Sequence, residues 1–267
     1  MNPKTILITG ATDGIGKATA RALAVQGHTV ILHGRNIARG QEAVAELRQA
    51  AGHERVDFIS ADLSSMRQVR ELAAAVQTRY PQLHVLINNA GVFMNERQVT
   101  EDGFEMTFAV NHLAPFLLTN LLLDKIKQSA PARIITVSSV AHQRGQIDFN
   151  DLQGARAFGG YKAYAQSKLA NVLFTYELAA RTADARVTAN CLHPGVIGTK
   201  LLQTGFGIGG ATPDAGARTS VYLASSPEVE TVTGAYFDNQ RAVPSAPHSR
   251  DVAVRRRLWE ISEELVM

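Results

Sequence analysis

Tyr164 and Lys168 are the residues of this 267-residue chain whose types and spacing most directly suggest chemistry. They lie four positions apart in a stretch, Tyr164 to Thr182, whose pattern predicts a helix, so both side chains should leave one face about one turn apart. A free tyrosine has a pKa of about 10 and is a poor base at neutral pH, but a nearby ammonium stabilises the phenolate and lowers that pKa. The pair is therefore a candidate for general acid–base catalysis. Alone, such a pair is usually a surface contact of a helix, so a second signal is needed.

The second signal is a glycine-rich turn, Gly10-x-x-x-Gly14-x-Gly16, which follows a short apolar run near the start of the chain. Glycines permit a tight turn and let the backbone approach a ligand closely. The helix that follows offers unpaired N–H groups and a partial positive charge to a pyrophosphate. An ordinary turn would use glycines too, but the position of this one at the first strand–helix junction favours a dinucleotide site. The expected cofactor contacts in the turn are Gly10, Thr12, Asp13, Gly14, Ile15 and Gly16.

The elements that must position these residues alternate along the chain. The early strand-like runs are nearly all apolar, as in a parallel sheet covered on both faces, and strand–helix alternation predicts a doubly wound α/β fold. No linker or repeat divides the sequence, so we expect a single Rossmann-type domain over residues 1–267, with about seven parallel strands and helices on both faces. The expected strands are Thr5–Thr9, His28–Leu32, Val56–Ser60, His84–Ile87, Arg133–Val137, Arg186–Leu192 and Gly234–Phe237. The expected helices are Ile15–Gln26, Ala38–Ala51, Met66–Tyr80, Gly103–Lys127, Tyr164–Thr182 and one around Leu258.

Composition narrows the classes of function. The net charge is +3 and the basic residues are spread along the chain without a recognition motif, so no nucleic-acid partner is expected. The tight cluster Arg255–Arg257 lies beside Leu258 and Trp259 at helical spacing and is interpreted as the solvated face of a C-terminal helix. The single cysteine, Cys191, cannot form an internal disulfide and is expected to be a small buried hydrophobe. We find no apolar stretch of 18 residues, no signal-peptide pattern and no metal-ligand spacing, and so expect a cytoplasmic protein without a membrane span or a metal.

Four motifs, in order and distance, resemble those of the short-chain dehydrogenase/reductase family. They are the glycine turn from Thr9 to Gly16, Asn88-Asn89-Ala90-Gly91 after the fourth expected strand, Tyr164-Ala-Gln-Ser-Lys168, and Pro194-Gly195 with Thr199 four residues on. The resemblance covers nearly the whole chain. Within the family, the segments Val137–His142, Ser167–Thr175 and Arg257–Glu260 resemble the retinol-dehydrogenase-like and WW-domain-oxidoreductase-like branch. The resemblance implies an oxidoreductase that moves a hydride between a nicotinamide and the carbonyl or alcohol carbon of a small substrate, with the protein supplying orientation and a proton.

The same resemblance implies catalytic roles. Tyr164 would be the general acid/base, Lys168 would also bind the nicotinamide ribose, and Ser139, at the end of the fifth expected strand, would hydrogen-bond the substrate oxygen. Ser138 is adjacent, and neighbours on a strand point to opposite faces, so we expect only one serine to face the site and prefer Ser139. Asn111 would hold a water that relays protons to Lys168, and a helix kink or a buried hydrogen bond is its alternative role.

Further cofactor contacts follow from the resemblance. Asp62 would contact the adenine through its side chain and Leu63 would cover the ring. A helix N-cap is the alternative for Asp62, with Ser64 a better-placed cap. The remaining expected contacts are Asn89, Ala90, Gly91, Pro194, Gly195, Val196 and Thr199.

The end of the second expected strand indicates which cofactor is used, because an acid there accepts bonds from a free ribose hydroxyl and would repel a 2′-phosphate. The segment Val30 to Asn36 has no acid, and Arg35 lies just beyond the strand. A guanidinium gives paired, charge-assisted hydrogen bonds to phosphate, so we expect NADP(H). Lys17 either adds positive charge or faces solvent, and the alternative for Arg35 is an ordinary exposed arginine.

The segment Val196 to Pro213 is rich in glycine and carries Leu201, Leu202, Phe206 and Ile208. We predict a lid that orders over an apolar substrate, with a plain surface loop as the alternative. Tyr161 has Ala165 where a catalytic tyrosine would have its lysine, so it is expected to pack near the site. The oligomeric state stays open between a monomer and a homo-oligomer built on the two long helices. A nucleotide sensor without turnover is the rival function, and the retention of serine, tyrosine and lysine disfavours it.

Overall fold

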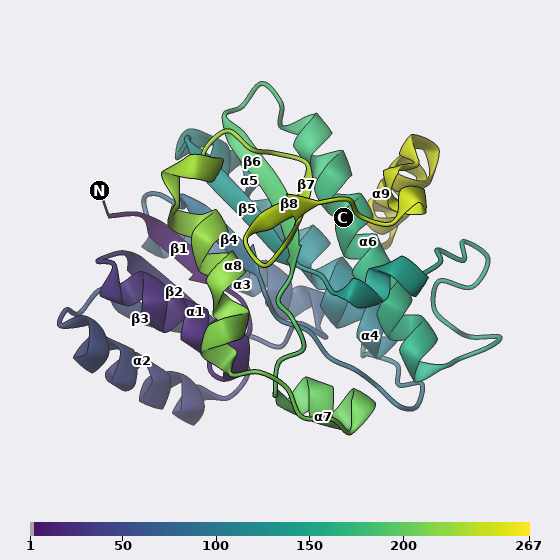
Figure 1. The fold of residues 1–267 in the computed structure, drawn as a ribbon, viewed down its shortest axis with the longest axis horizontal. Coiled ribbons are helices and arrows are strands. Elements are labelled where there is room, and N and C mark those ends of the chain that lie inside the picture. Colours follow the sequence, from purple (N-terminus) through teal and green to yellow (C-terminus); the bar gives the residue numbers. More distant parts are fainter. Residues whose placement is uncertain (1–2) are drawn as a thin grey trace.

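Short runs of aliphatic and β-branched residues pair side by side in one twisted sheet (Figure 1). The computed structural model describes residues 3–267. The strand order is β3-β2-β1-β4-β5-β6-β7-β8, in which β1 to β7 pair in parallel and β8 pairs antiparallel with β7. The strands are β1 (Thr5–Ile8), β2 (Thr29–Gly34), β3 (Val56–Ser60), β4 (Val85–Asn88), β5 (Ala132–Val137), β6 (Val187–His193), β7 (Ala235–Asp238) and β8 (Arg241–Val243).

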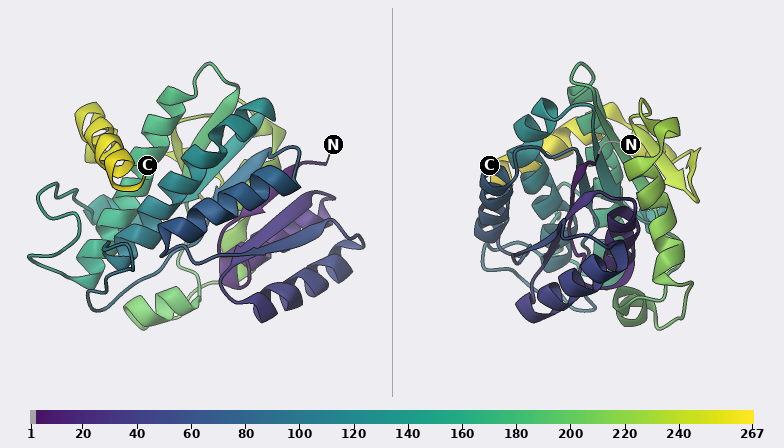
Figure 2. Two further views of the ribbon diagram at one scale, coloured as in Figure 1. Left: turned by 180° about the vertical axis from the view of Figure 1, so that it is seen from behind. Right: turned by 90° about the vertical axis from the view of Figure 1, so that its left-hand side faces the viewer.

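Helices cover both faces of the sheet (Figure 2). One layer holds α1 (Gly14–Val25), α2 (Ile37–Ala51) and α8 (Pro213–Ser225), in which α1 packs against both others. The opposite layer holds α3 (Met66–Arg79), α5 (Ala114–Gln128) and α6 (Gly160–Arg181), with α9 (Val252–Val266) lying on α6. The shorter elements are α4 (Met106–Phe108), the π-helical turn η1 (Ala109–Leu113), the 3₁₀ turns η2 (Val140–Arg144), η3 (Pro227–Val229) and η4 (Pro247–Arg250), and α7 (Lys200–Phe206).

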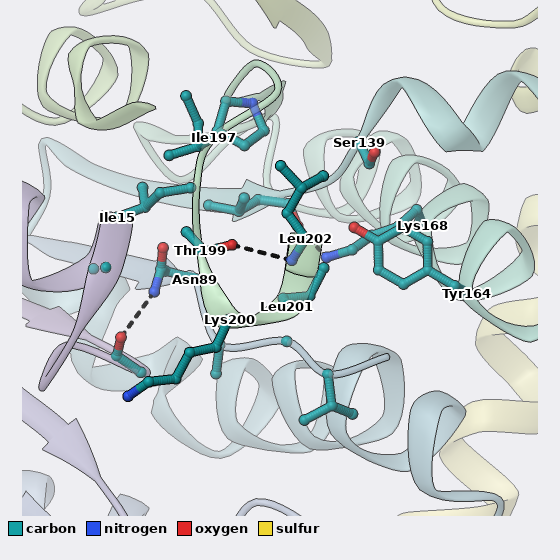
Figure 3. A pocket seen from close by; sticks show the side chains of 18 of the residues that line it. Ile15, Asn89, Ser139, Tyr164, Lys168, Ile197, Thr199, Lys200, Leu201 and Leu202 are labelled. Carbon is teal, nitrogen blue, oxygen red and sulfur yellow. Dashed lines mark hydrogen bonds between the residues drawn. The ribbon is translucent and has the colours of Figure 1, made fainter. Parts of the chain in front are cut away.

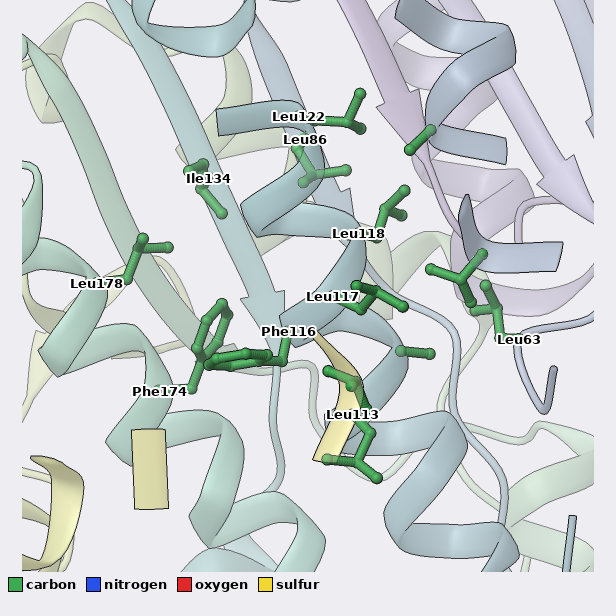
Figure 4. Close-up of a cluster of buried hydrophobic side chains, with 14 of the residues drawn as sticks. Leu63, Leu86, Leu113, Phe116, Leu117, Leu118, Leu122, Ile134, Phe174 and Leu178 are labelled. Atoms are coloured by element: carbon green, nitrogen blue, oxygen red, sulfur yellow. The ribbon is translucent and has the colours of Figure 1, made fainter. Parts of the chain in front are cut away.

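Alternation along the strands divides the core in two. On β1, Leu7 faces the α3–α5–α6 layer, whereas Ile6 and Ile8 face the α1–α2–α8 layer. Figure 4 shows the first cluster, where Phe116 of α5 meets Phe174 of α6 at a ring-centroid separation of 5.6 Å. Burial on both faces explains why these strands are continuously apolar.

The fold class expected from the sequence is confirmed, but some elements are not. The sequence pattern missed β8 and α8, and it placed the start of one helix at Gly103. That helix begins at Met106, because the Glu105 carboxylate accepts hydrogen bonds from the Thr107 and Phe108 N–H groups and acts as its N-cap. A π-helical turn then interrupts it before α5.

The segment Met106–Gln128 needs comment because its mean hydropathy of 1.4 and its length of 23 residues would allow a membrane crossing. The sequence predicts a helix over Gly103–Lys127 here and no membrane span. In the structure 78% of its apolar window is buried inside the protein, so it belongs to the core.

The sheet also sets where a ligand can bind. Strands β1 and β4 are neighbours in the sheet. From β1 the chain adds β2 and β3 on one side, and from β4 it adds β5 to β8 on the other side, so the strand order reverses between β1 and β4. In open α/β sheets the ligand crevice lies at such a switch point, beyond the carboxyl ends of the strands. The glycine turn follows β1, Asn89 follows β4 and Ser139 follows β5, so three of the motifs meet at this edge.

Candidate active site

One cavity of about 1240 Å³ lies over the carboxyl ends of the central strands. The glycine turn lines it at one side and Ser139, Tyr164 and Lys168 line it at the other (Figure 3). Of the site residues predicted from the sequence, all line this cavity except Asn111, which lies behind its wall. The predicted residues that line it are Gly10, Thr12, Asp13, Gly14, Ile15, Gly16, Arg35, Asp62, Leu63, Asn89, Ala90, Gly91, Ser139, Tyr164, Lys168, Pro194, Gly195, Val196 and Thr199.

The glycine turn has the geometry that only glycine allows. Gly10 and Gly14 have φ angles of +64° and +54°, in the left-handed region that other residues rarely adopt. A Cβ on Gly16 would lie 2.2 Å from the Gly10 carbonyl oxygen. Asn89 holds the turn from the neighbouring strand, because its Nδ2 donates to Thr9 O at 2.8 Å and to Gly10 O at 3.1 Å. The first turn of α1 is thereby open to a ligand that approaches its N–H groups.

Ser139 leaves β5 in extended conformation, with its hydroxyl at the cavity (Figure 3). Its neighbour Ser138 is buried and donates a hydrogen bond to the Lys168 carbonyl oxygen at 2.7 Å. The preference for Ser139 as the substrate-facing serine therefore agrees with the geometry. On α6, Lys168 lies one turn after Tyr164, and its Nζ donates to Val137 O at 3.0 Å.

Burial dominates the electrostatics of the Tyr164 and Lys168 pair. Burial raises the pKa of Tyr164 to about 12, and the Ser139 hydroxyl opposes that shift in part. Burial also lowers the pKa of Lys168 to about 8, well below that of a free lysine. The expectation that Lys168 lowers the tyrosine pKa is therefore not met. Desolvation of the phenolate is the largest cause of this shift.

Asn111 lies in the π-helical turn η1 and is fully buried. Its Nδ2 donates to Val92 O and to Ser167 Oγ, both at 3.0 Å, and its Oδ1 accepts from Val92 N at 2.8 Å. A Cβ on Gly91 would lie 3.4 Å from both Asn111 Oδ1 and Lys168 Nζ, so these two atoms flank the same point. The buried hydrogen bonds named as an alternative are present, and π-turns of this kind are frequent at functional sites.

The far end of the cavity carries positive charge. Arg35 lies at the end of β2 with its Nη1 3.7 Å from Asp62 Oδ2, and its side chain is 68% exposed. Arg39, in the first turn of α2, lines the cavity too and was missed in the sequence analysis. The suggestion that Lys17 contributes charge here is wrong, because its ammonium pairs with Glu46 of α2 at 2.5 Å.

Asp62 forms a local turn beside the expected adenine site. Its Oδ1 accepts hydrogen bonds from Ser64 N at 2.9 Å and Ser64 Oγ at 2.8 Å. The N-cap of α3 is neither of these residues but Ser65, whose side chain accepts from Gln68 N. Leu63 is buried at the cavity wall.

The segment predicted as a lid contains a helix, α7, that lies across the cavity (Figure 3). Thr199 caps it by accepting a hydrogen bond from Leu202 N at 3.3 Å. Phe206, at its end, packs against Phe93 and Tyr164 at ring-centroid separations of 5.3 and 6.1 Å. Lys200, at its start, lies 2.6 Å from the Asp13 carboxylate and lowers the pKa of that acid. No residue of α7 is buried.

Several residues that were assigned no catalytic role pack inside the protein. Cys191 is fully buried, and burial raises its pKa to about 12, so it is a packing residue without thiolate character. Trp259 of α9 stacks on Phe174 at 5.7 Å, and Tyr161 packs against Phe206 in the cavity wall. Arg255 departs in part from the solvated face assigned to it, since it pairs with Glu177 of α6 at 3.0 Å.

Comparison with known proteins agrees with this geometry. The family model described as "short chain dehydrogenase" matches residues 4–206. The chain belongs to the short-chain dehydrogenase family. Human retinol dehydrogenase 14 is 45% identical to this dehydrogenase, with 100% of this chain and 87% of the relative covered. Human retinol dehydrogenase 13 is also 45% identical, over 98% of this chain and 84% of the relative. These relatives support the retinol-dehydrogenase-like resemblance.

Solved structures show the same fold. A protein of Mycobacterium paratuberculosis is 35% identical to the dehydrogenase and superposes with a TM-score of 0.82, over 98% of this chain and 93% of that one. A short-chain dehydrogenase of Escherichia coli CFT073, solved in complex with NADPH, is 26% identical with a TM-score of 0.74, over 90% of this chain and 98% of that one.

Proposed function

We propose that this dehydrogenase transfers a hydride between NADP(H) and the carbonyl or alcohol carbon of a small apolar substrate, with Tyr164 as general acid/base. The observation that carries the proposal is the convergence, in one cavity, of the glycine turn with Ser139, Tyr164 and Lys168. A nucleotide-binding protein without turnover would need the first feature but not the second. Lys168 is 3% exposed and Tyr164 is 6% exposed, and ionisable groups are seldom buried this far without a role.

The residues present fit a dinucleotide. The turn leaves no room for a Cβ on Gly16, opens the α1 N-terminus and has Lys200 to offset the charge of Asp13. When bound there, the nicotinamide would supply or accept the hydride. Asn89 and the glycines would hold the pyrophosphate half, and Lys168 with the Pro194–Thr199 segment would hold the nicotinamide half.

The chain's own residues would handle the proton. In the reductive direction the Tyr164 hydroxyl donates its proton to the carbonyl oxygen as that oxygen gains charge. The raised pKa of about 12 keeps Tyr164 protonated at neutral pH and ready to donate. The Ser139 hydroxyl donates a second hydrogen bond to the same oxygen and orients the carbonyl. Lys168 stabilises the phenolate that remains, and it does so best when protonated, below its own pKa of about 8.

We infer an apolar substrate from the cavity wall around Tyr164 and from the names of the relatives, which are retinol dehydrogenases. The outer part of the wall carries Arg144 and three glutamines, Gln98, Gln143 and Gln203, but most of its side chains are aliphatic or aromatic. These groups are Met94, Met106, Val110, Val140, Ala141, Leu201, Leu202, Phe206 and Ile208. Such a wall binds a hydrocarbon body and leaves the few polar groups to fix its reactive end.

The test is turnover by a Tyr164→Phe variant. Oxidation of NADPH by a panel of aldehydes and ketones, including retinal, is followed by absorbance. Tyr164→Phe removes only the transferable proton, so kcat should fall by about 10²–10⁴-fold while the Kd for NADPH, measured by fluorescence, stays unchanged. Lys168→Ala should lower kcat and raise the Kd for NADPH, because this lysine both stabilises the Tyr164 phenolate and binds the nicotinamide ribose.

Tyr161→Phe is the matched control, since it removes a second cavity hydroxyl that has no lysine partner, and its effect on kcat should be far smaller. A Tyr164→Phe enzyme with more than about a tenth of the wild-type kcat would show that another group donates the proton.

A further inference from the structure

His142 lies directly behind Ser139, outside the cavity, and is fully buried. The proposed chemistry assigns it no role. Its Nδ1 is 2.7 Å from the Ser139 carbonyl oxygen, and its Nε2 accepts a hydrogen bond from the Ala246 N–H at 3.1 Å. The imidazole therefore bridges the serine at the end of β5 to a segment more than 100 residues further along the chain, just before α9.

These two partners fix the protonation state of the ring. A carbonyl oxygen only accepts, so Nδ1 must carry the hydrogen that it donates to Ser139. A backbone N–H only donates, so Nε2 must be bare. The tautomer of a histidine is often ambiguous because its partner can either donate or accept a hydrogen bond. Neither partner of His142 can do so, and the ring is neutral with its proton on Nδ1.

The surroundings keep the ring neutral. Burial lowers the pKa of His142, the hydrogen bond to Ser139 opposes that shift, and the charge of His248 on η4 adds to it. The Tyr236 ring of β7 packs on the imidazole at a centroid separation of 4.6 Å. The other ionisable groups around the ring are His193 on β6, whose pKa burial also lowers, Asp238 on β7, which opposes that shift, and Tyr176 on α6.

The segment that supplies Ala246 is rigidly held. Tyr176 Oη donates to Ser245 Oγ at 2.7 Å, Ser245 Oγ and Ser249 Oγ are 2.7 Å apart, and Ser249 Oγ donates to Ala246 O at 2.6 Å. All four side chains are buried. The position of the Ala246 N–H is consequently fixed, and its hydrogen bond to Nε2 fixes the orientation of the His142 ring.

We propose that His142 is a positioning residue: its neutral Nδ1–H tautomer fixes the Ser139 main chain, and so aims the Ser139 hydroxyl at the substrate oxygen. The inference rests on the proposed function, since it assigns Ser139 a substrate contact. Ser139 O also accepts from the His142 N–H at 3.1 Å, so backbone and side chain of one residue clamp the same carbonyl. Protonation would put a hydrogen on Nε2 facing the Ala246 N–H, two donors would oppose each other, and the clamp would open.

The expected consequence is an acid limb in the pH profile. Above the pKa of His142, which lies below 6.5, the clamp is intact and kcat is full. As the pH falls through that pKa the ring gains a proton and kcat decreases, while the Kd for NADPH stays constant because the glycine turn is not involved. A purely structural histidine would change thermal stability without this split between kcat and cofactor binding.

Two variants and one control test the assignment in the full-length protein. His142→Leu removes the hydrogen bond and should lower kcat at pH 7.5 by roughly three- to tenfold, the value expected for one neutral bond. His142→Asn keeps an N–H donor near Nδ1 but cannot titrate, so it should regain most of kcat and lose the acid limb. His28→Leu removes another buried histidine, one that accepts from Lys4 N at the opposite edge of the sheet, and should lower stability without changing the profile.

The outcomes separate the two proposals. Wild-type kcat and an unchanged acid limb in His142→Leu would overturn the positioning role, and a dead Tyr164→Phe enzyme would still support the proposed function. If the wild type reduces no carbonyl, the proposed function fails. Ring ¹⁵N chemical shifts of His142 at pH 7.5 then decide the remaining point, and a proton on Nε2 would contradict the clamp.

Discussion

At the scale of single residues, we expect two arginines to determine the choice of cofactor. Arg35 and Arg39 line the end of the cavity beyond β2, where Asp62 is the neighbouring acid. A hydrogen bond to a charged group contributes about 1.5–3 kcal/mol, and the exposure of Arg35 reduces this toward the lower figure. We therefore expect NADPH to be preferred over NADH, and Arg35→Ala or Arg39→Ala each to reduce the kcat/KM ratio by about tenfold. The measurement is kcat/KM for both cofactors in each variant.

Lys17→Ala is the matched control because this lysine is engaged with Glu46 on the outer side of α2. It should leave the cofactor ratio unchanged. Equal use of NADPH and NADH by the wild type would show that neither arginine binds a 2′-phosphate.

The motifs that form the site could be predicted from the sequence, whereas the orientation and burial of individual side chains could not. Gly10, Asn89, Ser139, Tyr164 and Lys168 were found because each belongs to a motif of fixed spacing and follows directly from a strand or a helix face. Arg39 was missed, and the role of Lys17 was left open, because only the packing of α2 against α1 decides which side chain reaches the cavity. The pKa of Tyr164 was assigned the wrong direction because burial cannot be read from a spacing of four.

At the scale of elements, α7 should behave as a lid. It buries none of its residues, and its side-chain contacts over the site are the Lys200–Asp13 pair, the Asn95 hydrogen bond to Thr204 O, and the packing of Leu201 and Phe206. Helices held by so few contacts open with little free energy. Amide hydrogen exchange over residues 200–206 should be fast in the free enzyme. Its rate should decrease at least severalfold when NADPH and a substrate analogue are bound. Residues 170–179 of α6, all buried and outside the cavity, provide an internal reference that should not change.

Phe206→Ala should raise the KM for an apolar aldehyde more than that for NADPH, since the ring contacts Phe93 and Tyr164 at the substrate end. Equal exchange with and without ligands would instead make this segment an ordinary surface loop.

Elements that were missed share a physical cause. Of the six buried residues of α8, only Leu223 is large. The small ones, Gly216, Ala217, Thr219, Ser220 and Ala224, let α8 pack closely on α1 but give little hydrophobic periodicity. The long helix before β5 was placed correctly in general, and the π-turn at Asn111 corresponds to the helix kink that was named as an alternative for this residue. Strand β8 has three residues, two of them exposed, and carries no apolar signal.

At the scale of the whole molecule, α9 changes what the long helices can do. It lies along α6, with Trp259 stacked on Phe174 and 4.8 Å from Phe116, and with Arg255 paired to Glu177. Residues 164–179 of α6 are consequently buried within one chain. A homo-oligomer built on the two long helices would have to use surface that α9 leaves uncovered.

Buried histidines should make the whole fold sensitive to mild acid. Burial lowers the pKa of His33 to about 4 and that of His112 to about 3, and it also lowers the pKa values of His28, His84, His142 and His193. In the unfolded chain each histidine titrates near 6.5. Above that pH both states are neutral at these residues and stability does not depend on them. Below it the unfolded chain binds protons that the folded chain refuses, so the free energy of unfolding decreases as the pH falls.

The size of this effect is measurable by urea unfolding at pH 7.5 and pH 5.0. His33 and His112 should each lower the free energy of unfolding by about 2 kcal/mol over this interval, because pH 5.0 lies 1.5 units below 6.5 and each unit corresponds to about 1.4 kcal/mol. The total of at least about 4 kcal/mol is a large share of the 5–15 kcal/mol that holds a typical domain. Carboxylates with lowered pKa values, such as Asp13, titrate below this window and do not offset the loss. His112→Gln removes one titrating group from the core and should reduce the difference between the two pH values by about 2 kcal/mol. Equal unfolding free energies at pH 7.5 and 5.0 would mean that the folded protein does not hold His33 and His112 neutral at pH 5.0.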